Sequence, residues 1–478
     1  MSATRCSATP PPRSSQEEWR TLLCWLLPDH TIFSTVPLHG NTKWLPRHLV
    51  FLALVWAWSD ARCLTDAFAE ALPQVCDLFP GPLPSTYQGL MNALLAHTAE
   101  LLPLLRGVLH LRMRQIGGRF WRVDGWVPLA FDGSRCTAPR TRSNEAGFCA
   151  RTYGKGKTAT YRKKKSKGLR RRQNRAHPGQ PPAPQTWLTL LWHMGLRLPW
   201  SWRIGPSNAS ERAHAAEMLA EESFPAHTLF CGDAGFVGYD FWSGILSAGH
   251  HFLVRVGGNV NLLAEADGYV CENKGRQRHV LCWPAAAKAA GRPPLRLRLF
   301  RVRIGKATVW LLTSVLERER LTVPQAERFY RLRWGVEIEF RNLKQTMARG
   351  SLRCRTADRL LVELEWSLMA LAVAELFATK EQSERRVGGP DPAPALDPKG
   401  RSLTATLRVI RRSLRGADGT LAEGLRAART DGYQRKKSKK AWYRPPNPDK
   451  KPLGEPKIRR MEGEERSQWR QLREKARI

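Results

Sequence analysis

The sequence predicts an α/β domain that lies between a helical N-terminal domain and a helical, basic C-terminal region. Three observations support this fold class. Apolar residues recur at helical spacing up to Met113. Beyond Trp121, short apolar runs end at aspartates that small residues follow. Alternating, β-type runs then precede a long amphipathic helix. A chain of 478 residues is long enough to hold two or three such domains.

The composition indicates a polyanionic partner. The formal net charge is +36, and each neutralised phosphate releases condensed counterions, so we expect double-stranded DNA as the partner. The longest apolar run, Leu49–Trp58, is about half of what a membrane-spanning helix needs, so no membrane partner is expected. The N-terminus has no apolar signal core, and the ten cysteines contain no C-x-x-C pair. Both observations favour a cytoplasmic protein with reduced thiols.

The pattern changes along the chain place the domain boundaries. Within the catalytic domain, a basic, proline-rich loop and a β-rich insertion interrupt the α/β pattern. The predicted order is a disordered N-terminus (1–15), a helical DNA-binding domain (16–118), the catalytic domain (119–350, with the loop at 155–185 and the insertion at 258–318), a helical region (351–429) and a basic tail (430–478).

The basic loop has two interpretations. Its core, Lys155–Arg175, contains eleven Lys or Arg, and no acidic residue occurs anywhere in 146–210. Like charges at this density repel one another, which favours a solvated linker. The same charges also suit a segment that becomes ordered on the DNA backbone.

Two aspartates share one predicted context. The run Trp126–Phe131 predicts a strand that ends at Asp132, and Thr228–Gly232 predicts a strand that ends at Asp233. The carboxyl ends of strands are where α/β sheets display their chemistry. Aspartate is also common in turns, so each residue taken alone is either a turn residue or part of a site.

A predicted helix over 322–347, with Thr322 as its N-cap, carries a second signal. Tyr330, Arg333, Glu337 and Lys344 stand at offsets of three, seven and fourteen. At about 100° per residue they share a stripe roughly 60° wide. Apolar residues form an adjoining stripe that can be buried. The alternative is a surface helix with an ordinary ion pair between Arg333 and Glu337.

The string from Tyr330 to Lys344 resembles the Y-x2-R-x3-E-x6-K signature of bacterial DDE transposases of the "insertion sequence four" family. The sequences around Asp132 and Asp233 are similar to the first and second aspartate regions of that family. The resemblance covers about residues 120–350. It implies an RNase H-like catalytic core, with the third carboxylate on a helix after a β insertion.

The resemblance also implies a catalytic and metal-binding site made of Asp132, Asp233 and Glu337. Two Mg²⁺ ions, or Mn²⁺ as the alternative, would activate the nucleophile and stabilise the leaving oxygen, with Asp132 bridging them. The expected activity is cleavage and strand transfer of mobile-element ends, which is cut-and-paste transposition. Two alternatives remain open: a nuclease on the same core that cuts without joining, and an inactive, basic DNA-binding protein.

Five residues are expected to contact DNA. By resemblance, Tyr330, Arg333 and Lys344 would hold phosphates near the cleaved end. Trp334 would stack on a displaced base or pack within the fold, and Arg255 is a further DNA-binding candidate. The expected partners are element ends and target DNA, bound by a homodimer, in the nucleoid of a bacterial cytoplasm.

Overall fold

In the computed structural model, the protein is described over residues 14–149, 184–265, 277–305, 307–384, 396–417, 419–430 and 453–475. The core of the predicted basic loop, 155–175, lies outside these residues. Within them, no helix is both long and apolar enough to cross a membrane. The chain forms two compact units: unit 1 comprises Met1–Ile116, Asn342–Arg349 and Asp358–Gln434, and unit 2 comprises Gly117–Arg341, Gly350–Ala357 and Arg435–Ile478.

Unit 1 is helical, and its N-terminal and C-terminal helices share one core. Trp19 and Trp58 pack with ring centroids 6.0 Å apart, and Phe377 lies 6.2 Å from Trp58. The indole N–H of Trp19 donates to Ser413 Oγ at 3.0 Å. The helical regions predicted separately at 16–118 and 351–429 therefore fold together. The helices are α1 (Ser15–Leu26), α2 (Pro46–Trp58), α3 (Leu64–Leu78), α4 (Tyr87–Ile116), α13 (Ala357–Ser383), α14 (Leu403–Leu414) and α15 (Leu421–Ala427), with short helical turns at η1 (Thr31–Phe33) and η3 (Asn342–Thr346).

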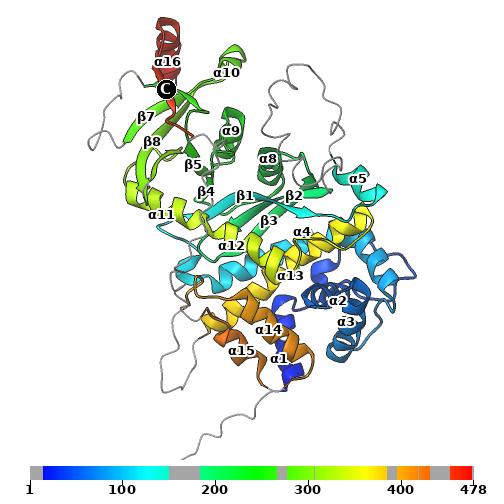
Figure 1. Ribbon diagram of the computed structural model, residues 1–478. Coiled ribbons are helices and arrows are strands. Elements are labelled where there is room, and N and C mark those ends of the chain that lie inside the picture. Colours follow the sequence, from blue (N-terminus) through cyan, green and yellow to red (C-terminus); the bar gives the residue numbers. More distant parts are fainter. Residues whose placement is uncertain are drawn as a thin grey trace, which may run out of the picture. The chain divides into compact units, whose positions relative to one another are not determined.

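Unit 2 is built on one mixed sheet (Figure 1). Its described strands are β1 (Val127–Thr137), β2 (Gln185–His193), β3 (Leu198–Pro206), β4 (Thr228–Gly232), β5 (His251–Val256), β6 (Asn261–Ala264), β7 (Gln277–Cys282), β8 (Leu295–Ile304), β9 (Ala307–Thr313) and β10 (Lys457–Arg460). They lie in the order β10-β6-β7-β8-β9-β5-β4-β1-β2-β3. β4 is parallel to both β1 and β5, whereas β2 is antiparallel to both of its neighbours, β1 and β3.

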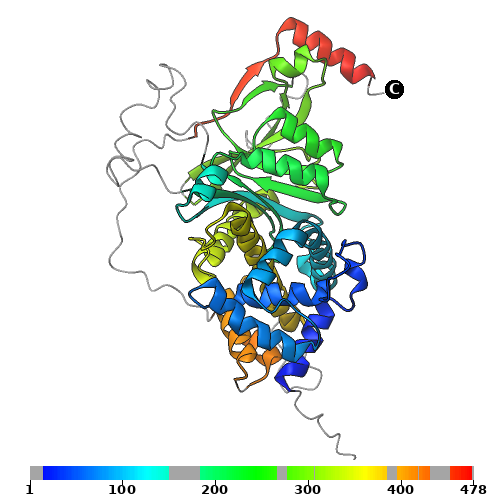
Figure 2. The same ribbon diagram turned by 90° about the vertical axis from the view of Figure 1, so that its right-hand side faces the viewer.

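Helices cover both faces of this sheet (Figures 1 and 2). On one face lie α8 (Glu211–Glu221) and α9 (Tyr239–Ser247); on the other lie α11 (Val323–Arg333) and α12 (Gly335–Arg341). Alternate residues of β1 point to opposite faces, because the side-chain period of a strand is two residues. The remaining short helices of unit 2 are η2 (Gly118–Phe120), α5 (Arg142–Phe148), α10 (Ala285–Ala289) and α16 (Gly463–Lys475).

Several predicted elements are confirmed, and two differ. β4 ends at Gly232, directly before Asp233, as predicted, and Ser210 caps the start of α8. β1, however, does not end before Asp132 but continues to Thr137, because β2 pairs with it along that whole length. Asp132 is therefore a residue within a strand and not a turn residue.

The predicted single helix over 322–347 is wrong in its continuity. Thr322 does cap α11, with its side chain accepting from the backbone N–H of Gln325. The α-helix then ends at Arg333, where the N–H of Trp334 turns back to the carbonyls of Arg331 and Leu332. Helix α12 follows, and residues 342–346 form a π-helical turn. Helical spacing in the sequence cannot register such a break, because the apolar pattern continues across it.

Part of the predicted basic tail is structured. β10 adds a parallel strand to the sheet edge at β6, and α16 follows it. Arg459 Nη2 contacts Glu465 Oε1 at 2.6 Å, and Lys288 also pairs with Glu465. The hydrogen bond from Arg459, and to a smaller extent the one from Lys288, lowers the pKa of Glu465 to about 2. The ion pairs fasten α16 to the insertion.

Candidate active site

Asp132 points toward α11. Because side chains alternate along β1, its neighbour Phe131 faces the opposite side and packs 5.4 Å from the ring of Phe236. Asp132 Oδ2 lies 3.6 Å from Nη1 of the buried Arg333. Its other oxygen accepts the backbone N–H of Gly133 at 2.9 Å. The strand thus presents one carboxylate in a protected position beside a single guanidinium.

Asp233 comes directly after β4, the parallel neighbour of β1. The register pairs Ala130 with Cys231, so Asp132 and Asp233 lie at matching heights on adjacent strands. Asp233 Oδ1 accepts the N–H of Gly235 at 2.7 Å, which fixes the turn after the strand. The structure therefore brings together two aspartates that are about a hundred residues apart in sequence.

Glu337, on α12, completes this group. The pKa of Asp132 is raised to about 6, mainly because burial disfavours the charged carboxylate. Arg333 opposes this shift, whereas the negative charges of Asp233 and Glu337 add to it. Asp233 and Glu337 are thus each close enough to Asp132 to act on it electrostatically.

The chemistry of this group suits a hard divalent cation. All three side chains offer carboxylate oxygens, which Mg²⁺ prefers, and their mutual repulsion would be relieved by a bound cation. Within the described ranges, however, no three His, Cys, Asp or Glu side chains are arranged closely enough to form a finished metal site. In this arrangement, the positive charge beside Asp132 comes from Arg333.

The four residues of the predicted helical stripe are separated by the break at Trp334. Tyr330 and Arg333 are buried, with 2% and 4% of their surfaces exposed, and the guanidinium lies 5.4 Å from the Tyr330 ring. Trp334 is 49% exposed. Lys344 lies in the π-helical turn, which belongs to unit 1, whereas the other three belong to unit 2. The four residues thus come from three consecutive helical segments, α11, α12 and the turn at Asn342–Thr346.

Arg255 lies on β5, beside the strand that carries Asp233. Its neighbour Val254 pairs with Gly232, so Arg255 stands near the carboxyl end of β4. The side chain is half-buried. This position keeps Arg255 close to the edge of the sheet at which Asp233 stands.

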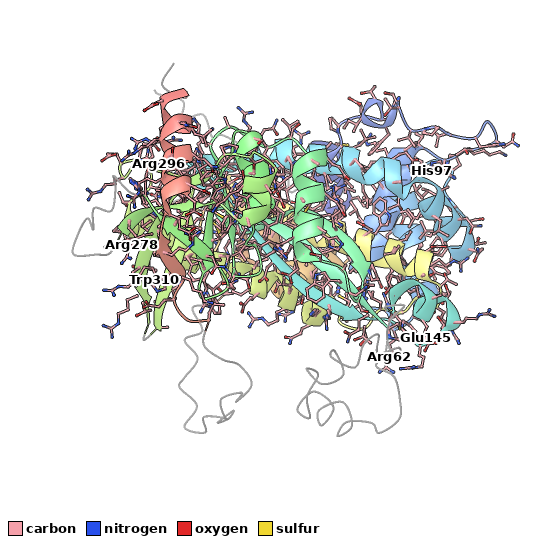
Figure 3. All side chains as sticks on the ribbon, turned by 90° about the horizontal axis from the view of Figure 1, so that it is seen from above. Arg62, His97, Glu145, Arg278, Arg296 and Trp310 are labelled. Atoms are coloured by element: carbon pink, nitrogen blue, oxygen red, sulfur yellow. The ribbon has the colours of Figure 1, made fainter. Side chains whose placement is uncertain are left out.

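The β insertion adds basic and aromatic side chains (Figure 3). Arg278 on β7 lies 5.8 Å from the ring of Trp310 on β9. Arg296 on β8 pairs with Glu265 at 3.0 Å. Arg301 and Arg303 are exposed on β8. The predicted β-rich segment is thus also a basic surface.

One acidic residue near this group was not predicted from the sequence. Glu211, the first residue of α8, has its pKa raised to about 7 by burial and by the charges of Asp233 and Asp132. A glutamate after a serine N-cap is typical of an ordinary helix start, where it interacts with the helix dipole. The sequence around Glu211 therefore indicated an ordinary helix start and did not single out Glu211 as a functional residue.

The comparison with protein families supports a DNA-cutting function. The Transposase DDE domain family matches residues 188–373, a range that includes Glu211, Asp233 and Glu337 but begins after Asp132. A solved structure of the piggyBac transposase synaptic complex with hairpin DNA is similar, with 10% identity and a TM-score of 0.41 over 85% of this chain and 83% of that chain. No curated protein matches. Residues 188–373 are therefore similar to the transposase DDE domain, a similarity that supports a DNA-cutting enzyme.

Proposed function

We propose that this chain is a cut-and-paste DNA transposase of the "insertion sequence four" family, with Asp132, Asp233 and Glu337 as its catalytic carboxylates. The observation that carries the proposal is that the charges of Asp233 and Glu337, both within the matched domain, act on the carboxyl group of Asp132 beside it. They come from two parallel strands and one helix that are far apart in sequence. A purely structural role would not require three like charges to converge at a partly buried point.

The strand arrangement supports an RNase H-like core. Five strands lie in the order β3-β2-β1-β4-β5, with β2 antiparallel to β1 and with β1, β4 and β5 parallel. The first two carboxylates then stand on the central pair of strands, and the third comes from a helix that follows the β insertion. This is the arrangement that the resemblance in sequence implies.

Two Mg²⁺ ions, or Mn²⁺ in their place, would be held by Asp132, Asp233 and Glu337. Bound there, the ions supply Lewis acidity for in-line displacement at phosphorus. The buried guanidinium of Arg333 keeps Asp132 oriented and partly ionised before an ion arrives. Gly133 and Gly235 hold the two aspartates through their backbone N–H groups.

DNA would be bound by the basic surface around this group. Trp334 is exposed and available for stacking on a base, and Arg255 lies near the same edge of the sheet. Tyr330, Arg333 and Lys344 remain candidates for phosphate contacts, although the burial of Tyr330 and Arg333 favours a supporting role for these two. Element ends and target DNA as substrates, a homodimer on DNA and a place in the bacterial nucleoid belong to the same proposal.

The test uses the purified chain with duplexes taken from the DNA that flanks its gene. We expect Mg²⁺-dependent cleavage at inverted repeats, followed by joining of the released 3′ ends to a target plasmid. Cleavage without joined products would favour a nuclease instead. Binding without either reaction, in Mg²⁺ and in Mn²⁺, would favour an inactive DNA-binding protein and would overturn the proposal.

A further inference from the structure

Glu211 occupies a place that two glycines leave open. A Cβ added to Gly133 would lie 2.3 Å from Glu211 Oε1, and one added to Gly235 would lie 3.4 Å from Oε2. Glycine within a strand is unfavourable relative to alanine, because its backbone loses more conformational freedom on folding. At Gly133 the missing side chain has a structural reason, because any larger residue would overlap with the Glu211 carboxylate.

The surroundings of this carboxylate repel it. Its charged neighbours include Asp132 and Asp233, and Arg135 provides an opposing charge. Among the residues that the structure describes, no hydrogen bond or ion pair holds the Glu211 side chain. The chain has 78 Lys and Arg against 42 Asp and Glu, so most carboxylates can find a basic partner. A half-buried carboxylate that faces other carboxylates instead is arranged for a cation that comes from solution.

An ordinary helix start does not explain this position. A glutamate in the first turn interacts favourably with the helix dipole from the solvent side. It needs neither a glycine in the neighbouring strand nor contact with a second glycine after β4. The Ser210 side chain already accepts the N–H of Ala213, so the helix is capped without Glu211.

We infer that Glu211 is a fourth carboxylate of the metal-binding centre, on the side of Asp233. The inference rests on the proposed function, since it assumes that Asp132, Asp233 and Glu337 bind divalent cations. Glu211 would provide one or both oxygens to the ion that Asp233 holds. The centre would then be built from four elements of unit 2: β1, the turn after β4, α8 and α12.

The test measures binding of Mn²⁺ alone to the full chain by calorimetry and by electron paramagnetic resonance. Glu211→Gln keeps the shape of the side chain and removes its charge; we expect the Mn²⁺ affinity to fall about tenfold or more. Glu217→Gln, at an exposed position of the same helix, is the matched control and should bind like the wild type. Circular dichroism and melting curves without metal check that each variant is folded.

Gly133→Ala provides a second route to the same group, because it pushes the carboxylate aside without altering its charge. We expect it to weaken Mn²⁺ binding, and the double variant with Glu211→Gln to bind no more weakly than the weaker single variant. Wild-type affinity in Glu211→Gln, together with a loss in Asp132→Asn, would overturn the inference and leave the proposed function standing. Absence of Mn²⁺ binding in the wild type would overturn both.

Discussion

The close approach of α12 to the sheet can be tested at Gly335. A Cβ at this position would lie 2.2 Å from Cη2 and 2.8 Å from Cζ3 of Trp192. Trp192 is 1% exposed, so its ring has no room to move away. Ordinary contacts of a Cβ begin near 3.4 Å, and Gly335→Ala would therefore push α12 outward by about 1 Å.

Overpacking of this kind typically costs about 1–3 kcal/mol. The higher helix propensity of alanine relative to glycine offsets up to about 1 kcal/mol of this cost. We therefore expect the free energy of unfolding to fall by about 1–2 kcal/mol. For a unit of this size that corresponds to roughly 2–4 °C in melting temperature per kcal/mol. The shift of α12 would also move Glu337, so cleavage should fall more than stability does.

Gly244→Ala is the control, because it makes the same change within α9 with nothing within 4 Å of the new Cβ. It should stabilise the protein by about 0.4–1 kcal/mol. Both variants would be compared with the wild type in thermal and urea unfolding followed by tryptophan fluorescence. If Gly335→Ala were as stable as Gly244→Ala, the close packing of α12 on Trp192 would be refuted.

Three further predictions concern charge. Folding raises the pKa of Asp132 from 3.8 to about 6. The protonated carboxyl group therefore adds to the free energy of unfolding below pH 3.8, and this contribution is lost as the pH rises through 6. At about 1.4 kcal/mol per pKa unit, the contribution is roughly 3 kcal/mol at most. Stability measured without metal across this range should fall less steeply in Asp132→Asn, and an unchanged slope would contradict the assignment. Glu465→Gln should weaken the docking of α16 by about 1.5–3 kcal/mol, seen as faster hydrogen exchange over residues 457–475; equal exchange in the exposed control Glu464→Gln would show that the ion pairs are unimportant. Replacing Arg162, Lys163, Lys164, Lys165, Arg170, Arg171 and Arg172 with Gln should make the log–log salt dependence of DNA binding shallower by a few units on any duplex, and an unaltered salt slope would favour a solvated linker.

The sequence predicted the strands and several helices well, because their local signals agree with the final structure. Ser210 and Thr322 cap the helices that their residue types indicate. The apolar run before Asp233 ends where β4 ends. The end of β1 was predicted a few residues too early, at Asp132. The strand continues through polar residues because β2 pairs with them.

The site was predictable only in part. Asp132, Asp233 and Glu337 were proposed from context and from the resemblance; in the structure Asp132 and Asp233 stand at matching positions on adjacent strands, and Glu337 acts on the pKa of Asp132. Glu211 was missed because its local pattern already had a complete explanation as a helix start. The break at Trp334 was missed because the apolar spacing in the sequence continues across it.

The central claim is that the carboxylates perform catalysis rather than hold the fold or bind DNA. The most direct measurement compares Asp132→Asn and Glu337→Gln with the wild type for both cleavage and affinity on an element-end duplex. We predict that cleavage falls by several orders of magnitude, whereas affinity stays the same or rises because repulsion from the phosphates is removed. Parallel loss of cleavage and affinity in both variants, or cleavage at the wild-type rate, would contradict the account.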